Sequence, residues 1–509
     1  MRALARPLEV VAGAVVCLIA AVLVTGGWVV GGLSLTRPED LLVLLVGLVA
    51  LRLVVAPVTL PAVRPGRAVA IGVAVYALAM GFIVVTRHLS FRTHALDLGY
   101  YVQVVWSIAA GHGAYVTLPP MHAWGDHFSP ILYLFVPLGW LAPGAIALLL
   151  AQTAIFAAGA VVMAGFAMRR LGDARTAAGF AVLYLLNPTL HGINVRDVHP
   201  TAFAIPLVIA AAWAVDAGRP AGAAVAVVAA LAGREDVAIA GVGFGVWLAV
   251  ARRRWAVGVA TAILCVGLLW LDMNVLMPHF RGEPYPHLVK RYAYLGHTLP
   301  EVLASVVVRP WRWMPVVFTP EKAFHLLALL APLGFLPLAA PRVAAAALPG
   351  LAVNLLSTDP FLFHHRTQYQ AFVLPFLLLA AVEGFATLRD ATWRPRWLSA
   401  RAVVIGAGIV SVVLAARTVN ELGISKWSLG PEQRAAHALM ARVPWLVPVS
   451  VNERLVPHLA TREECYVFPA GLQRAQWVLD VEAIVAREQV AGFEVVAREH
   501  GWALLRRGG

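Results

Sequence analysis

The chain has 509 residues, of which 60% are hydrophobic and only 13% are charged. An ordinary soluble domain has about 25% charged residues, and the mean hydropathy here is +0.77. This composition excludes a soluble globular enzyme, a disordered chain, a coiled coil and a collagen. Apolar runs of about 20 residues recur along the chain, which is typical of a helical membrane protein that crosses the bilayer many times.

The apolar runs predict about thirteen transmembrane helices. The first run follows Arg2 and Arg6 and is longer than the core of a signal peptide, so we interpret it as a helix that is not removed. After this run, which ends near Val30, the predicted spans are 40–59, 68–86, 145–168, 175–190, 200–216, 220–233, 237–251, 255–276, 323–340, 342–357, 369–388 and 402–418.

The apolar stretch 128–142 is shorter and is interrupted by Pro130 and Pro137. Proline removes a helical hydrogen bond, so we predict a re-entrant or interfacial segment here. With the N-terminus in the cytoplasm, the arginine clusters of short loops, such as 252–254, then all face the cytoplasm, as the positive-inside rule requires. Topology thus accounts for much of the net charge of +13, and no nucleic-acid partner is expected.

We expect the protein in the cell membrane, and this topology divides the chain into two domains. Residues 420–509 have the composition of a soluble segment with alternating short strands and helices, which predicts a small extracytoplasmic α/β domain. That domain has no glycine-rich phosphate loop and no nucleophile elbow, so we expect a recognition or stabilising module. Residues 1–419 form the all-α multi-pass transmembrane domain, with outer loops at 87–144, 188–199, 277–322 and 358–368.

Polar residues gather in five islands on the predicted outer side. In the first island, Asp97 precedes a segment that we expect to lie as an interfacial helix, with Tyr100 and Tyr101 at the depth of the lipid headgroups. The same loop continues to Asp126 and His127. The other four islands contain Arg196, Asp197 and His199; Arg234, Glu235 and Asp236; Arg291; and His364, His365, Arg366 and Tyr369.

Each of these side chains has two interpretations. A carboxylate at an outer helix end can take part in chemistry, or it can cap the helix or pair locally, as Glu235 or Asp236 would with Arg234. The cations of loop 277–322, Arg291 among them, can bind a lipid phosphate or only anionic headgroups. No strict metal motif is present, although ligands for a divalent cation could assemble across loops.

At these islands the sequence resembles a family of prokaryotic polytopic membrane proteins of unknown function that is related to the GT-C superfamily of glycosyltransferases. The resemblance covers about residues 70–480. The matching motifs are LDLGYYVQVVW (Leu96 to Trp106), GDHFSP (Gly125 to Pro130), RDVHP (Arg196 to Pro200), GREDV (Gly233 to Val237) and HHRTQYQAFVLPF (His364 to Phe376).

The resemblance implies a GT-C-like fold and an enzyme that transfers a hexosyl or pentosyl group from a polyprenyl-phosphate-linked sugar on the outer face of the membrane. It places Asp97 where that superfamily has an acidic residue in its first large outer loop. Two extra helices precede this loop and no Asp-X-Asp motif follows, which leaves a requirement for a divalent cation open. The resulting hypothesis makes Asp97, Glu235 and Asp236 catalytic and assigns substrate binding to Asp126, His127, Arg196, Asp197, His199, Arg234, Arg291, His364, His365, Arg366 and Tyr369.

The alternative is a membrane transporter or lipid flippase without covalent chemistry, and a third hypothesis is a non-catalytic membrane scaffold. Transporters usually place their ionisable groups near the midplane of the membrane and contain internal repeats. Here the predicted spans are mostly free of charge, with Asp272 and Glu383 as the main exceptions, and no repeat is evident. The sequence therefore favours the glycosyltransferase.

Overall fold

The computed structural model describes residues 4–55, 63–140, 144–286, 291–392, 399–488 and 490–508. The end of the predicted span 40–59 and the segments 141–143 and 287–290 of the predicted outer loops lie outside the described residues.

The described part of the chain is mostly helical, and four of its helical segments are long and apolar enough to cross a membrane by themselves. They are α1 (Ala5–Thr25), α3 (Pro65–Leu89), α5 (Gly144–Leu171) and the continuous segment Trp255–Arg281, which comprises α11, η8 and α12. A pair of helices bent by 66°, Pro310–Val317 and Pro320–Leu333, raises this number to five at most. The expected thirteen spans therefore stay a prediction.

The remaining predicted spans coincide with shorter helices. Many of them are interrupted because proline and glycine break the backbone ladder, as at Pro332 and Pro337 within the predicted span 323–340. The longer of these helices are α2 (Pro38–Val55), α6 (Ala174–Leu185), α8 (Ala204–Asp216), α9 (Pro220–Leu231), α10 (Ala238–Val246), α16 (Pro320–Leu330), α18 (Leu348–Leu356), α19 (Leu374–Asp390) and α20 (Ala400–Ala415). A further helix, α7 (Pro188–Val195), lies in the predicted outer loop 188–199.

Helix α19 forms part of the core of the helical domain. Residues 374–382 are all buried, so more than two complete turns are covered on every side by other parts of the protein. At the end of this buried run, Glu383 accepts hydrogen bonds from Arg170 and Arg252 at 3.0 Å each. Arg252 also pairs with Asp216 at 2.7 Å, so the ends of α5 and α8 and the middle of α19 are joined by one ionic network.

The stretch 128–142 contains a 3-10 helix, η4 (Pro130–Trp140). Eleven residues at a rise of about 2.0 Å reach about 22 Å, which is short of the roughly 30 Å hydrocarbon core. The backbone amide of Ile131 donates to the carbonyl of Ala232 at 2.8 Å and ties this segment to the turn between α9 and α10. These features support the prediction that the stretch does not span the membrane.

The C-terminal segment forms a five-stranded mixed sheet in the order β6-β5-β7-β9-β8. Strand β5 is parallel to β6 and β7, whereas β9 is antiparallel to β7 and β8. A hairpin turn at His500 and Gly501 connects β8 to β9, with both residues at positive φ (46° and 83°). The elements are α23 (Pro431–Met440), β5 (Val449–Val451), α24 (Val456–Leu459), β6 (Cys465–Val467), β7 (Trp477–Val481), α25 (Glu482–Arg487), β8 (Phe493–Glu499) and β9 (Trp502–Arg507).

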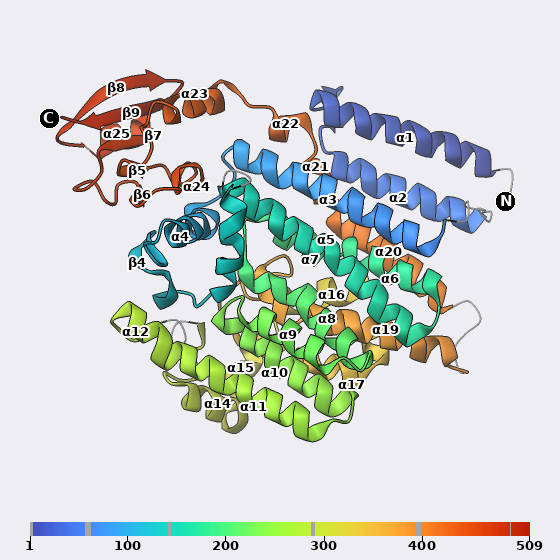
Figure 1. Cartoon of the computed structure of the whole chain (residues 1–509). Helices are drawn as coiled ribbons and strands as arrows, with labels where there is room; N and C mark the ends of the chain where they lie inside the picture. The colour runs from blue at the N-terminus through green and yellow to red at the C-terminus, as the bar shows by residue number, and fades with distance from the viewer. Residues whose placement is uncertain are drawn as a thin grey trace.

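The sheet lies at one end of the helical bundle, beside α4 (Tyr100–Ala109) and away from the N-terminus (Figure 1). The buried Gln103 of α4 links the two parts. Its side-chain amide donates to the backbone carbonyls of Arg462 and Glu463 at 3.2 and 3.1 Å and to the hydroxyl of Thr117 at 2.9 Å. Thr117 belongs to the small hairpin β3 (Tyr115–Thr117) and β4 (Pro120–His122), and its hydroxyl donates to the carbonyl of Cys465 at 2.7 Å.

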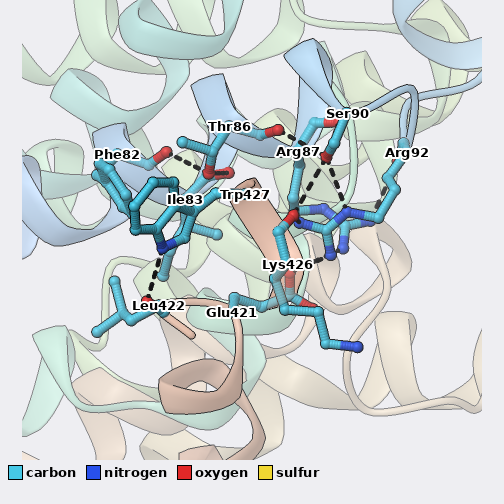
Figure 2. Close-up of polar contacts among 10 residues, drawn as sticks. All are labelled: Phe82, Ile83, Thr86, Arg87, Ser90, Arg92, Glu421, Leu422, Lys426 and Trp427. Carbon is cyan, nitrogen blue, oxygen red and sulfur yellow. Dashed lines mark hydrogen bonds and ion pairs between the residues drawn. The ribbon is translucent and has the colours of Figure 1, made fainter. Parts of the chain in front are cut away.

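A second junction joins the end of α3 to the connection between α20 and the sheet domain, which contains α21 (Arg417–Asn420) and α22 (Ile424–Trp427). The carboxylate of Glu421 pairs with Arg92 at 2.5 Å and with Arg87 at 3.3 Å. Arg92 also donates to the carbonyl of Lys426 at 2.8 Å (Figure 2). This ionic contact holds the connection against α3.

Candidate functional site

Asp97 lies in a short π-helical turn, η2 (Ala95–Gly99), that leads directly into α4. Its side chain is 48% exposed, and its nearest ionic neighbour is Nδ1 of His199 at 3.9 Å. A Cβ at Gly99 would lie 2.9 Å from Cγ1 of Val456, so the sheet domain packs closely against this turn. Asp97 therefore has an accessible carboxylate on a backbone segment that is covered from one side.

Asp197 lies near Asp97, but its carboxylate is already bound. It is 3% exposed and accepts hydrogen bonds from the backbone amide of His94 at 3.2 Å and from Nδ1 of His94 at 2.9 Å. The hydrogen bond to Asp197 raises the pKa of His94. Burial lowers the pKa of His199, although the carboxylates of Asp97 and Asp197 partly oppose this effect. The site thus presents a neutral imidazole beside Asp97.

Glu235 and His127 form a buried pair. Nδ1 of His127 lies 3.0 Å from one carboxylate oxygen of Glu235, and the backbone amide of Phe128 donates to the other at 3.0 Å. Burial alone would lower the pKa of His127, but the Glu235 carboxylate outweighs it and the pKa is raised. The pair links the loop after η3 (Ala123–Gly125) to the turn between α9 and α10.

Arg234 pairs with its neighbour Asp236, as the local interpretation of this turn anticipated. Nε donates to Asp236 at 2.9 Å, and the second guanidinium nitrogen also contacts this carboxylate. The guanidinium lies 5.8 Å from the ring centroid of Tyr369, and Arg291 lies 5.3 Å from the same ring. Because Arg291 also pairs with Asp359 at 3.1 Å, both arginines beside Tyr369 already have a carboxylate partner.

The outer acids come together around buried tyrosines of α4. Burial raises the pKa of Tyr101, and the charges of Asp97, Glu235 and Asp126 raise it further, while Arg234 opposes them. These groups must therefore lie within electrostatic reach of one hydroxyl. Tyr101 is 3% exposed, so its side chain lies inside the protein and does not contact the lipid headgroups, and the expectation that it lies at their depth stays a prediction.

Tyr100 is likewise 3% exposed and donates to the carbonyl of Ala123 at 3.1 Å, so it also does not face the headgroups. The two tyrosines follow Asp97 directly in the motif, yet their side chains are buried because α4 packs against η4 and the β3–β4 hairpin. Tyr285, which the sequence did not single out, is close to the same acids: its pKa is raised by burial, and by Glu235 and Asp126.

Asp126 is half-buried, and within the described ranges no hydrogen bond or ion pair reaches its carboxylate. Asp197, Glu235 and Asp236 are all bound by neighbouring cations or imidazoles. Of the five outer acids, Asp97 and Asp126 therefore have the carboxylates that are available to another molecule.

The fifth island lies next to Arg196. The backbone amide of Arg366 donates to Nδ1 of His364 at 3.2 Å, and the rings of His364 and His365 are stacked at 5.1 Å. Burial lowers the pKa of His364, and the charges of Arg196 and Arg366 lower it further. This end of the site is cationic, with both imidazoles held neutral.

An apolar cavity of about 260 Å³ lies beside α4. Its lining includes Val102, Val105 and Trp106 of α4, Val136 of η4 and Leu148 of α5. In the described part of the chain, no group of three or more His, Cys, Asp or Glu side chains is arranged to hold a metal ion.

Two solved structures share the fold. ArnT from Cupriavidus metallidurans bound to undecaprenyl phosphate is 16% identical, with a TM-score of 0.54, and the match covers 86% of this chain and 97% of that one. The same protein in the apo state is 17% identical, with a TM-score of 0.51, and the match covers 86% of this chain and 98% of that one. The chain therefore has the fold of the GT-C glycosyltransferases, as the sequence resemblance implied.

The chain belongs to the family described as predicted membrane protein (DUF2079), whose model matches residues 87–501. This range begins near the end of α3 and contains every candidate site residue as well as most of the sheet domain. No curated protein matches the chain.

Proposed function

We propose that this protein is a membrane glycosyltransferase that uses a polyprenyl-phosphate-linked sugar on the outer face of the cell membrane. The observation that carries the proposal is the available carboxylate of Asp97 at the start of α4, within the fold of a GT-C enzyme. The related structure of ArnT was solved with undecaprenyl phosphate, which supports a lipid-linked donor.

In the proposed reaction, Asp97 accepts the proton of the acceptor hydroxyl while that oxygen forms a bond to the anomeric carbon of the sugar. The bond between this carbon and the phosphate oxygen breaks, and the electron pair leaves with the lipid phosphate. A positioned carboxylate base accelerates such a step by about 10²- to 10⁴-fold, and nearby cations stabilise the charge on the departing phosphate. No step requires a metal ion.

Glu235 and Asp236 act through the groups that they bind. Glu235 holds His127 beside Asp126, and Asp236 holds Arg234 against Tyr369. Asp197 and His199 flank Asp97 from the other side. The apolar cavity beside α4, the helix that follows Asp97, supports a lipid-linked donor, because it could hold part of a hydrocarbon chain.

The test uses membranes that contain the full chain and a radiolabelled polyprenyl-phosphate sugar. The intact protein should transfer label to an acceptor, and Asp97→Asn should abolish transfer while leaving the amount of folded protein unchanged. The matched control is Asp173→Asn, because Asp173 caps α6 outside the site and asparagine is an equally good cap. Full transfer by Asp97→Asn would refute the role of this acid, and transport of the sugar without a covalent product would favour a flippase.

A further inference from the structure

Three arginines beside the outer acids have no protein partner for their charge. Arg196 ends α7, Arg366 lies between the fifth-island histidines and η12 (Gln368–Phe372), and Arg417 begins α21. In the ranges that the structure describes, no ion pair and no side-chain hydrogen bond reaches any of these three guanidinium groups.

The three arginines come from distant parts of the chain, but the elements that carry two of them are in contact: α7, which is followed by Arg196, packs against α21, which begins at Arg417. Burial lowers the pKa of Arg366, and the charges of Arg196 and Arg417 lower it further. The side chain of Arg366 lies directly against Gly192 of α7, where a Cβ would overlap it. A glycine at that position lets the guanidinium approach the end of α7 that carries Arg196.

A carboxylate near Arg366, that of Glu421, is bound by other cations. Glu421 follows α21 and lies within electrostatic reach of Arg366, but it is bound by Arg92 at 2.5 Å and by Arg87 at 3.3 Å. Figure 2 shows the side chains of Arg87 and Arg92 close together, with Arg92 donating to the hydroxyl of Ser90 and to the carbonyl of Lys426. Glu421 therefore satisfies another pair of cations.

Other arginines at partly or fully buried positions do have partners. Arg234 binds Asp236, Arg291 binds Asp359, and Arg252 binds Asp216 and Glu383. Arg366 is partly buried and Arg196 and Arg417 are exposed, and like charges gathered at one place repel each other until an anion binds between them. The planar guanidinium group matches phosphate oxygens in pairs, which makes a phosphate group the ligand best suited to several converging arginines.

We propose that Arg196, Arg366 and Arg417 form a phosphate-binding subsite, with His364 and His365 at its edge. The proposal rests on the proposed function in one respect, namely that the phosphate is the one that links the lipid to the sugar; the same chemistry would also bind a free phosphate ion. Arg196 lies within electrostatic reach of both Asp97 and Asp197, so the bound group would adjoin the proposed catalytic acid. Arg291, already paired with Asp359, would then have no part in holding this phosphate.

The test measures ligand binding by the purified full chain in detergent, and it does not depend on transfer. The probes are farnesyl phosphate, farnesol and inorganic phosphate, titrated calorimetrically. Loss of a charge-assisted hydrogen bond should weaken farnesyl phosphate binding by about 10- to 100-fold in Arg417→Gln, while farnesol binding should not change. Arg442→Gln, whose arginine pairs with Glu499 on the sheet domain, is the matched control and should bind as the unaltered chain does.

Arg366 packs closely against α7, so Arg366→Gln can affect folding, whereas Arg417 is exposed and its replacement is mild. Arg417→Lys keeps the charge without the paired donors and should bind with intermediate affinity. Competition by inorganic phosphate would support a subsite for the free ion, and binding of farnesyl phosphate alone would support one for the lipid phosphate. Unchanged binding of both phosphates in Arg417→Gln and Arg417→Lys would overturn the subsite.

The glycosyltransferase proposal and the phosphate-subsite proposal can each be refuted without the other. If Arg417→Gln loses phosphate binding but no sugar transfer is found, the subsite stands and the glycosyltransferase assignment falls. If transfer requires Asp97 but Arg417→Gln binds farnesyl phosphate normally, the enzyme stands and the subsite falls.

Discussion

Glu235 and His127 are 108 residues apart in the sequence, and their side chains meet at 3.0 Å in the buried centre of the site. The pair joins the loop that follows the β3–β4 hairpin to the short turn between α9 and α10. Any movement of that loop relative to the helices must therefore break a buried ionic contact.

This pair should make stability depend on pH. The raised pKa of His127 contributes stability that is fully present below the unfolded value of about 6.5 and is lost as pH rises through the folded value. Burial would raise the pKa of Glu235, but His127 and Arg234 lower it, so its contribution is present above about pH 4.3 and is lost as pH falls through the folded value. Glu235→Gln should therefore be most destabilising between about pH 4.3 and 6.5, by about 2 kcal/mol.

Thermal unfolding of the detergent-solubilised protein, followed by tryptophan fluorescence over pH 4 to 9, measures this difference. Glu494→Gln, at an exposed position of β8, should give a curve parallel to that of the unaltered chain. A constant difference across the whole range for Glu235→Gln would contradict the charged pair.

Gln103→Leu should loosen the sheet domain. The substitution leaves the backbone amide of Thr117 and the carbonyls of Arg462 and Glu463 without their buried partner, at a cost of about 1–3 kcal/mol for each unsatisfied group. Limited proteolysis should release the C-terminal segment faster than from the unaltered chain. Gln473→Leu, at an exposed position in the same domain, is the control and should not change the rate.

Gly258→Val should prevent the close crossing of α10 and α11. A Cβ at Gly258 would lie 2.5 Å from the backbone nitrogen of Ala249, a contact that only movement of the helix can relieve. Gly267, on the same helix, has nothing within 4 Å, so Gly267→Val is a matched control. We expect monodisperse protein in size-exclusion chromatography from Gly267→Val and aggregated or absent protein from Gly258→Val.

Arg252→Gln should destabilise the network that joins the ends of α5 and α8 to the middle of α19. It removes the cation between Asp216 and Glu383 and leaves two carboxylates to Arg170 alone. Breaking a buried ionic network in this way costs about 3–5 kcal/mol, and the loss should appear as a lower unfolding temperature. Arg254→Gln, exposed two residues further on, should have little effect on that temperature.

The predicted orientation can be tested in intact cells with a thiol reagent that does not cross membranes. In a Cys17→Ser background, Gln473→Cys should react from outside, because the sheet domain is predicted to be extracytoplasmic. Arg219→Cys should react only after permeabilisation, since the turn between α8 and α9 is predicted to face the cytoplasm. The reverse pattern would contradict the proposed topology.

Local patterns predicted those features that depend on neighbouring residues. The apolar run from Gly144 to Leu171 and the strands of the C-terminal domain follow from hydropathy and strand pattern, which act within one segment. The outer polar islands are visible in the sequence for the same reason, as breaks in otherwise apolar segments. Arg417 carries no such signal, because it lies at the edge of a predicted span, where it resembles an ordinary flanking arginine.

By itself the sequence determined that this is a membrane protein, since long runs without charge reflect the cost of placing charge in hydrocarbon. Through the positive-inside rule it also predicts that the candidate acids and histidines lie on one side of the membrane. It could not decide which acids are available, because Asp197 is bound by His94 and Glu235 by His127 across separations of 103 and 108 residues. Only the tertiary structure brings such partners together. It left Asp97 and Asp126 as the accessible carboxylates, because packing of α4 against the sheet domain and η4 buries the neighbouring tyrosines but not these two acids.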